Sequence, residues 1–143
     1  MSAATNYTES KALTYLLTST ADTRPTAWYV GLFTTATDDA GGGTEVSGNA
    51  YVRKAVLLAN GSTPGFTIST SGSSPNISTY AKNALDITWP VATGSWGTIT
   101  HIAIFDAVSS GNMLFHGAVT SSKSIANGDT FQILANNLSI ELQ

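Results

Sequence analysis

The segment SWGTITHIAIFDA, residues 95–107, decides the fold class. A strand predicted over residues 97–107 is apolar on both faces, with Ile102 and Ile104 on one side and Ile99, Ala103 and Phe105 on the other. Such a strand is covered on both faces, so we expect it at the centre of a sheet and not at an exposed edge. The turn sequence SSGN at 109–112 then returns the chain as an antiparallel hairpin.

Turn-rich segments divide the chain beyond Pro25 into short stretches of β pattern, at a spacing typical of a sandwich or barrel. In the first stretch Val30 and Leu32 share one face with Trp28, and Phe33 lies on the other. We predict an all-β fold in one domain: an antiparallel β-sandwich, jelly-roll or Greek-key-like, of six to eight strands. The predicted strands span residues 27–35, 51–58, 66–70, 84–89, 97–107, 112–121 and 129–142.

One short helix is predicted near the N-terminus, over about residues 7–19. Asn6 can cap it, and Glu9 stands three residues later, where it can return the bond. A helix this short needs tertiary packing to persist. We therefore expect it to lie against an open edge or end of the sheet, with docking to a partner as the alternative. The apolar stripe available for either contact is Ala12, Leu13, Leu16 and Leu17.

In the last predicted strand the apolar residues are odd-numbered before Asn136-Asn137 and even-numbered after it. A one-residue slip moves side chains to the opposite face. We expect a β-bulge there, which would keep the apolar residues on one side. The alternative is that the chain crosses from one sheet to the other at this point. The residues concerned are Phe131, Ile133 and Ala135 before the change and Leu138, Ile140 and Leu142 after it.

Two long loops are predicted, over residues 37–49 and 61–79. The first carries three acids, Asp38, Asp39 and Glu45, around a run of glycines. Carboxylates are ligands for calcium, but the alternation of ligands around a fixed glycine that a calcium loop requires is absent. We therefore predict a solvent loop without a metal.

The two histidines, His101 and His116, are the only ones a catalytic triad or zinc site could use. In the predicted strands His101 shares a face with Ile99, and His116 shares one with Leu114. Each is expected to be a packing residue with one satisfied nitrogen. Asp106 follows a strand, where a carboxylate usually shapes a turn. The sequence has no Gly-x-Ser-x-Gly elbow, so no catalytic, cofactor-binding or metal-binding residue is predicted, and the protein is expected not to be an enzyme.

Three tryptophans raise the question of sugar binding by ring stacking. Trp89 precedes Pro90, and Trp96 lies between Ser95 and Gly97 at the start of the central strand. Both positions suit rings that close the end of a β-sandwich better than rings on a glycan-binding surface. A carbohydrate site stays the alternative.

Charge is sparse, at 10% of residues, and the net charge is −3. Six scattered lysines and arginines form no stripe that would neutralise phosphates, so no nucleic-acid partner is expected. No apolar run is long enough for a membrane span, and no secretory signal is apparent. Without cysteine, disulfides are excluded. A surface with so few charges does not repel close neighbours, which suits a protein that works inside an assembly.

Four segments, taken in order, carry a family resemblance: YVGLFTT at 29–35, DDAGGGTEVSG at 38–48, YVRKAV at 51–56, and residues 95–107. Together they resemble a family of small tailed-bacteriophage virion proteins, described as tail-fibre or capsid-decoration proteins. The resemblance extends from about Tyr7 to the C-terminus. It implies a building block of the particle.

Within that family we expect a capsid decoration (cement) protein on the head surface, made in the host cytoplasm, because no shaft or repeat typical of a long fibre is present. Its partners would be the major capsid protein and itself, as a homotrimer or else a dimer. The alternative is a tail-fibre or receptor-binding module that recognises a host surface glycan. A third possibility, a hydrolase of the host envelope, has no motif in its favour.

Overall fold

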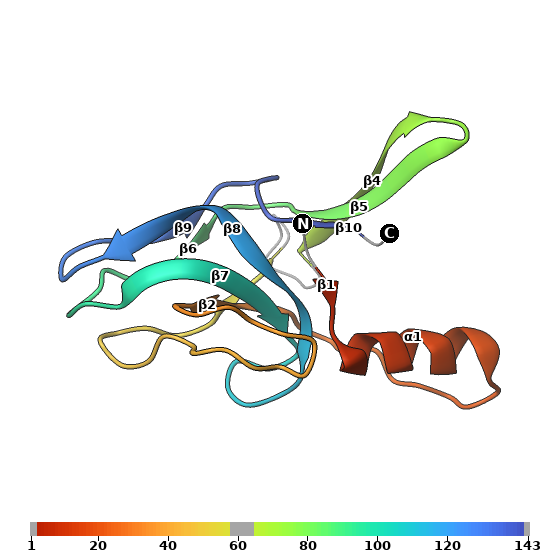
Figure 1. Cartoon of the computed structure of the whole chain (residues 1–143), viewed down its shortest axis with the longest axis horizontal. Coiled ribbons are helices and arrows are strands. Elements are labelled where there is room, and N and C mark those ends of the chain that lie inside the picture. Colours follow the sequence, from red (N-terminus) through yellow and green to blue (C-terminus); the bar gives the residue numbers. More distant parts are fainter. Residues whose placement is uncertain (1–2, 58–64, 142–143) are drawn as a thin grey trace.

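The structure is a computed structural model that describes residues 3–57 and 65–141 of the chain (Figure 1). Within these residues it is mostly β, with one short helix, and its strands pair antiparallel throughout. The predicted fold class, an all-β sandwich with one N-terminal helix, is confirmed. The elements are β1 Ala3–Ala4, α1 Asn6–Leu17, β2 Tyr29–Phe33, β3 Lys54–Ala55, β4 Phe66–Ser73, β5 Asn76–Asn83, β6 Ile87–Thr88, β7 Gly97–Phe105, β8 Met113–Ile125, β9 Gln132–Ile133 and β10 Ser139–Glu141.

A five-stranded sheet with the order β1-β8-β7-β2-β3 forms one layer of the sandwich. The second layer consists of a three-stranded sheet, β10-β5-β4, and the two-stranded pair β6-β9. Strand β7 has two partners, β8 and β2, and its residues Ile99, Ala103, Ile104 and Phe105 are buried. The prediction that this strand is central and covered on both faces is confirmed. The return strand β8 is longer than predicted, ending at Ile125 instead of residue 121.

Two irregularities in the pairing of β7 with β8 change which side chains share a face. The register shifts between Ile99 and His101 and again between Ile104 and Phe105. A bulge changes the parity of a strand, so residues on either side of it no longer alternate simply. Ile99 therefore packs in the main core with Ile104, and not with Ala103 and Phe105 as the simple alternation predicted.

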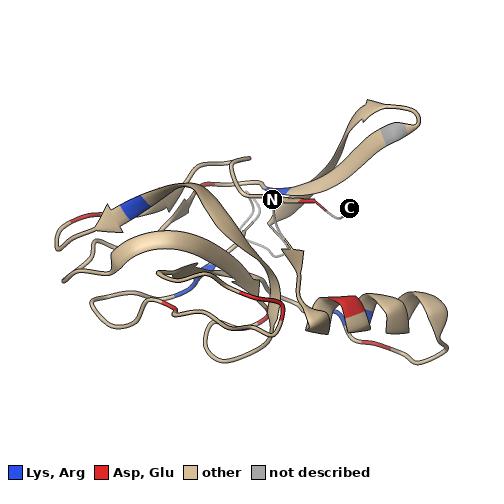
Figure 2. Ribbon diagram, viewed as in Figure 1, with Lys and Arg blue, Asp and Glu red and all other residues tan. Residues whose placement is uncertain are grey.

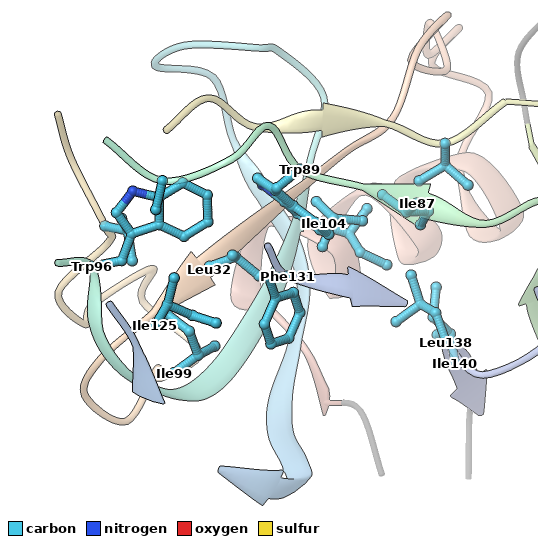
Figure 3. Packing of buried hydrophobic residues seen from close by; sticks show 14 of the residues in the cluster. Leu32, Ile87, Trp89, Trp96, Ile99, Ile104, Ile125, Phe131, Leu138 and Ile140 are labelled. Atoms are coloured by element: carbon cyan, nitrogen blue, oxygen red, sulfur yellow. The ribbon is translucent and has the colours of Figure 1, made fainter. Parts of the chain in front are cut away.

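The main core lies between the five-stranded sheet and the segments that carry β6, β9 and β10 (Figure 3). Among the described residues, fifteen buried hydrophobic side chains from both layers form this core, which therefore joins the two layers of the sandwich. Removing large apolar side chains from water is the main driving force for this packing. The buried set is Val30, Leu32, Val46, Val56, Ile87, Trp89, Ala92, Trp96, Ile99, Ile104, Leu114, Ile125, Phe131, Leu138 and Ile140.

A smaller cluster occupies the opposite face of the five-stranded sheet, where Phe33, Ala103, Phe105 and Met113 are buried. The loop over residues 37–49 passes close to it. A Cβ atom placed on Gly43 would lie 3.0 Å from the Phe33 ring, and this glycine has φ +110°. The glycine run therefore lets the loop approach the sheet closely. The predicted loop is confirmed, with only an isolated bridge from Glu45 to Phe33 inside it.

Helix α1 begins one residue earlier than predicted, and its cap is different. Thr5, not Asn6, is the N-cap; its hydroxyl accepts a bond from the Thr8 amide and donates one of 2.6 Å to the carbonyl of Met113. Thr5 is 1% exposed, so the same hydroxyl both starts the helix and ties it to β8. The helix meets β8 through its first turn, where the Thr8 hydroxyl donates to the Leu114 carbonyl, but no residue of α1 is buried and the leucine stripe does not make this contact.

A hairpin, β4–β5, replaces most of the long loop predicted over residues 61–79. Its strands pair from Phe66 opposite Asn83 to Ser73 opposite Asn76. The strand predicted over residues 66–70 lies within β4, whereas β5, with the sequence NISTYAKN, was not predicted, because its apolar residues do not alternate with polar ones. Residues 61–64 of the predicted loop lie outside the described residues. Figure 1 shows that the hairpin and α1 both project from the same end of the body.

The last predicted strand is two strands in two different sheets. Strand β9 pairs with β6, and β10 pairs with β5, with a turn at 134–137 where Asn136 has φ +66°. The alternative that the chain crosses from one sheet to the other is therefore confirmed, and the expected β-bulge is wrong. Asn83, fully buried, holds the crossing: its amide donates to the Leu134 carbonyl and its oxygen accepts from the Leu138 amide, each at 2.9 Å. Leu142 lies outside the described residues.

Candidate interaction face

A chain of three polar side chains connects the loop over residues 37–49 to β8. His116 Nε2 lies 2.9 Å from the Asp39 carboxylate, and His116 Nδ1 lies 2.8 Å from the Thr37 hydroxyl. A carboxylate only accepts, so Nε2 carries the proton and, in the neutral ring, Nδ1 accepts from Thr37. This order of groups is the one that activates a hydroxyl nucleophile in hydrolases. Here it also fastens the loop, since the Asp39 carbonyl accepts from the Asn6 amide at the start of α1.

The two histidines differ from their predicted surroundings. His116 uses both ring nitrogens, not one, and pairs across the sheet with Ala103 of the smaller cluster, whereas Leu114 lies in the main core. His101 bonds through Nδ1 to the Thr100 hydroxyl at 2.9 Å. The bulges described above separate both histidines from the neighbours that simple alternation assigned to them.

Arg53 is at the centre of a second polar cluster, beside β2. Its guanidinium donates to both carboxylate oxygens of Glu45, at 2.8 and 2.7 Å. It also stacks on the Phe105 ring, with the guanidinium carbon 3.3 Å from the ring centre. Tyr51 donates to the same carboxylate at 2.8 Å and accepts from the Leu32 amide at 2.9 Å. Burial raises the pKa of the Tyr51 phenol well above its ordinary value, and the neighbouring Glu45 carboxylate adds to the rise.

Gly31 of β2 makes room for this cluster. A Cβ atom at position 31 would lie 2.9 Å from a Glu45 carboxylate oxygen and 3.0 Å from the Phe105 ring, closer than a side chain allows. Because the ion pair, the aromatic ring and the tyrosine hydroxyl share their partners, they hold the loop, β2 and the turn after β7 in one arrangement.

The acids considered as calcium ligands are engaged separately. Asp38 accepts from the amides of Ala40 and Gly42 within its own loop, whereas Asp39 binds His116 and Glu45 binds Arg53. Within residues 3–57 and 65–141 no group of three or more histidines, cysteines or acids is placed to hold a metal ion. Asp106 accepts from the Asn112 amide at 2.7 Å, which confirms its predicted role in shaping a turn.

Two of the three tryptophans are packing residues, as predicted. Trp89 is 1% exposed and meets Phe131 edge to face, with ring centres 5.5 Å apart. Trp96 is 4% exposed, packs edge to face against Tyr51, and donates to the Asn49 carbonyl at 2.9 Å. Neither ring is available for stacking on a sugar. Trp28, only partly buried, is the ring left for contact with a ligand or partner.

The leucine stripe of α1 is a ridge of exposed apolar side chains. Leu13, Leu16 and Leu17 are 59%, 72% and 76% exposed. At 100° per residue these three positions fall within one 100°-wide stripe. A different side of the helix lines a groove of about 460 Å³ against the body, whose floor includes Trp28 and Phe115. The helix is therefore apolar on the side that it turns away from its own body.

The hairpin contributes a second exposed apolar surface beside this groove. Ile68 is 70% exposed and Ile77 is 56% exposed. Ile68 pairs with Ala81 and Ile77 with Gly72, so both isoleucines lie on the same face of the hairpin. That face borders a groove of about 360 Å³ lined by Trp28, Phe66, Ile68, Thr79, Tyr80, Ala81, Phe115 and Ile140.

We call these surfaces together the interaction face. Figure 2 shows few charges on it: the chain carries none over residues 12–20 of the helix arm or 66–81 of the hairpin. The sequence predicted the leucine stripe but not its exposure, and it did not predict the hairpin. The members of the interaction face are Leu13, Tyr15, Leu16 and Leu17 of α1, Trp28 and Phe115 of the floor, and Phe66, Ile68 and Ile77 of the hairpin.

Comparison with known families gives a match over nearly the whole chain. Residues 3–141 match the sequence model of a family described as "Podophage GP4 fiber I protein gp80". No curated protein matches the sequence. Among the described residues, no helix has both the length and the apolar character needed to cross a bilayer.

Proposed function

The chain belongs to the podophage GP4 fiber I protein family, and we propose that it is a structural subunit of a tail fibre. The resemblance to phage virion proteins is confirmed by this membership, which covers nearly the whole chain. The protein is therefore a phage fibre or structural protein, a component of the virion. The position at the tail is the proposal, and the fibre description of the family supports it.

The observation that carries the structural role is the interaction face. The main core of the sandwich buries its large side chains, with Trp89, Ile99 and Ile125 nearly inaccessible. Six large apolar residues on the two arms are nevertheless more than half exposed. Large apolar side chains exposed together on projecting elements are typical of a protein–protein interaction site. The body therefore serves as a rigid block, and the arms fix it to its neighbours in the particle.

Capsid decoration, the position expected from the sequence, is the competing assignment. Both positions require broad contacts with other virion proteins, so the interaction face does not distinguish them. The family description favours the tail. Particles that lack the protein distinguish the two: loss of adsorption to cells with heat-stable heads supports the fibre, and heads that release DNA more readily on heating support decoration.

We also propose that the protein has no catalytic activity. The Thr37–His116–Asp39 chain is the best candidate for hydrolysis, but it links the loop to β8 and α1, a sufficient structural reason for each bond. Incubation of purified protein with peptidoglycan and with host capsular polysaccharide tests this proposal. We expect no release of fragments. Release that is abolished by His116→Ala would overturn the proposal.

A further inference from the structure

We propose that a second copy of this chain covers the interaction face, with the Leu13-Leu16-Leu17 ridge of one copy seated in the groove between Trp28 and the hairpin of the other. This inference names the partner of the face described above, and it rests on the proposed function in that a fibre is assembled from repeated subunits. Three properties of the face favour a second copy as its cover: its area, its lack of charge and its shape.

The exposed apolar area of the ridge and the hairpin is large for a single chain. Their five most exposed residues, Leu13, Leu16, Leu17, Ile68 and Ile77, are 56–76% exposed, which together equals between three and four fully exposed side chains. A large apolar residue presents on the order of 150–200 Å², so these residues alone offer roughly 500–650 Å², to which the lining of the groove adds. The largest apolar patch of a monomer is usually about 300–600 Å², whereas a stable interface buries about 800 Å² on each partner.

The charge distribution also suits contact between identical surfaces. When two copies of a chain meet through the same surface, charged residues on that surface can be brought close to like charges, which a neutral surface avoids. The distal half of α1, over residues 12–20, and the hairpin over 66–81 carry no charged residue. Lys11 lies on the inner side of the helix and is paired there with Asp22. Arg24 also lines the groove between α1 and the body, away from the leucine ridge. The ridge and the hairpin can therefore meet without bringing charges of their own together.

The shape supplies complementary partners on one chain. The ridge on α1 projects outward, and the groove beside the hairpin is concave and lined by Trp28, Phe66, Ile68 and Phe115. An amphipathic helix laid in an apolar groove is a recurring mode of protein recognition. Figure 1 shows α1 and the hairpin at the same end of the molecule, so two copies related by rotation can each place the ridge of α1 in the groove beside the other's hairpin.

The stability of α1 gives a further reason for a cover. It has twelve residues, none of them buried, and isolated helices of this length are marginal in water. Its tie to the body runs mainly through Thr5 and Thr8, whose hydroxyls bond to the Met113 and Leu114 carbonyls. Tyr7 packs against the main core at the start of the helix, whereas the leucine side is exposed. A second copy on the leucine side would supply apolar packing there.

Engineered cysteines test the contact directly, because the chain contains none. One preparation carries Leu17→Cys, another carries Ile68→Cys, and the two are mixed and oxidised. We expect a disulfide-linked heterodimer from this mixture. Substitution of Val91, 56% exposed and outside the interaction face, gives the control pair: Val91→Cys mixed with Ile68→Cys should link much less. Equal linking in both mixtures would overturn the ridge-in-groove contact.

Sedimentation of the unlabelled protein tests the association itself. We expect wild type to self-associate, and Leu16→Glu/Leu17→Glu to raise the dissociation constant at least roughly 30-fold, the effect of losing one strong contact residue. Val91→Glu should leave it unchanged. Circular dichroism confirms that each variant is folded. Wild type that stays monomeric at a concentration on the order of 100 µM, where a standard interface would form, overturns the inference.

The two proposals fail separately. A monomer found at the tail overturns the second-copy contact and leaves the fibre assignment in place. A self-associating protein found on the head overturns the fibre assignment and leaves the second-copy contact in place.

Discussion

Replacing Arg53 with alanine removes the residue on which the cluster beside β2 depends. Its guanidinium makes the two-point bond to Glu45, donates to the carbonyls of Ala107 and Ser110 at 3.1 and 2.7 Å, and stacks on Phe105. The side chain is 10% exposed, so these contacts are only weakly screened by water. Loss of Arg53 should therefore release the loop after β2 from the turn after β7.

The stability lost in Arg53→Ala depends on the Glu45 carboxylate, which stays in place without its cation. Removing one partner of a buried ion pair costs about 3–5 kcal/mol. Glu45 is 25% exposed and keeps its bond from Tyr51, so part of that cost is avoided. We expect Arg53→Ala to lower the free energy of unfolding by about 2–4 kcal/mol. Arg53→Lys keeps the charge but loses the planar two-point bond and the stacking, and should cost about half as much.

Urea unfolding followed by tryptophan fluorescence measures both variants, at one protein concentration, because self-association adds to apparent stability. The reasoning is refuted if Arg53→Ala costs less than about 0.5 kcal/mol, the usual range of a surface substitution. It is also refuted if Arg53→Lys is as damaging as Arg53→Ala, since the charge would then contribute nothing.

Three further predictions address other parts of the molecule. Tyr51→Phe should destabilise by about 1–3 kcal/mol at neutral pH, because it leaves the Leu32 amide without its acceptor. The pKa of Tyr51 is raised in the folded protein, so above about pH 10 the phenol ionises first in the unfolded chain, and the stability that Tyr51 contributes is lost as the pH rises. Urea unfolding at about pH 9 and pH 11 should therefore show a smaller loss of stability for Tyr51→Phe than for wild type. An equal loss would contradict the raised pKa. Ile104→Asp should cost roughly 3–5 kcal/mol, since Ile104 is 3% exposed in the central strand, and a melting temperature within a degree or two of wild type would refute its core position. A chelator should leave the melting temperature unchanged, and a clear fall would revive a calcium site at Asp38 and Asp39.

The buried framework was predictable because a strand apolar on both faces must lie inside. Residues 97–107 met that condition, and β7 is the central strand. The plugging role of Trp89 and Trp96 followed from their neighbours in the sequence, and both are buried. These features depend on local pattern, and a single sequence contains that information.

Of the hairpin β4–β5, the sequence predicted only a strand over residues 66–70, inside β4; β5 and its pairing were not predicted, because the apolar residues of β5 do not alternate with polar ones. Side chains that do not alternate leave no strand signal. The cap at Thr5 was missed because its hydroxyl is held by a strand more than a hundred residues away. The two bulges between β7 and β8 were invisible for a related reason: pairing register is set by the partner strand.

The clusters of the candidate site depend on the same long-range contacts. His116 meets Asp39 across 77 positions of the chain, and nothing at either position indicates the other. The leucine stripe of α1 was read correctly as one apolar side, but its exposure depends on how the helix leaves the body. A single sequence reveals the apolar stripe of a helix, but it does not show whether the same chain or another one covers that stripe.

The position of this protein in the particle tests the fibre assignment most directly. A reconstruction of the virion, without imposed symmetry at the tail, would locate the β-sandwich with its two arms. The fibre assignment predicts density for these domains in appendages at the tail, and tail labelling by gold-conjugated antibody. Density and label distributed over the head, between capsid subunits, would contradict it.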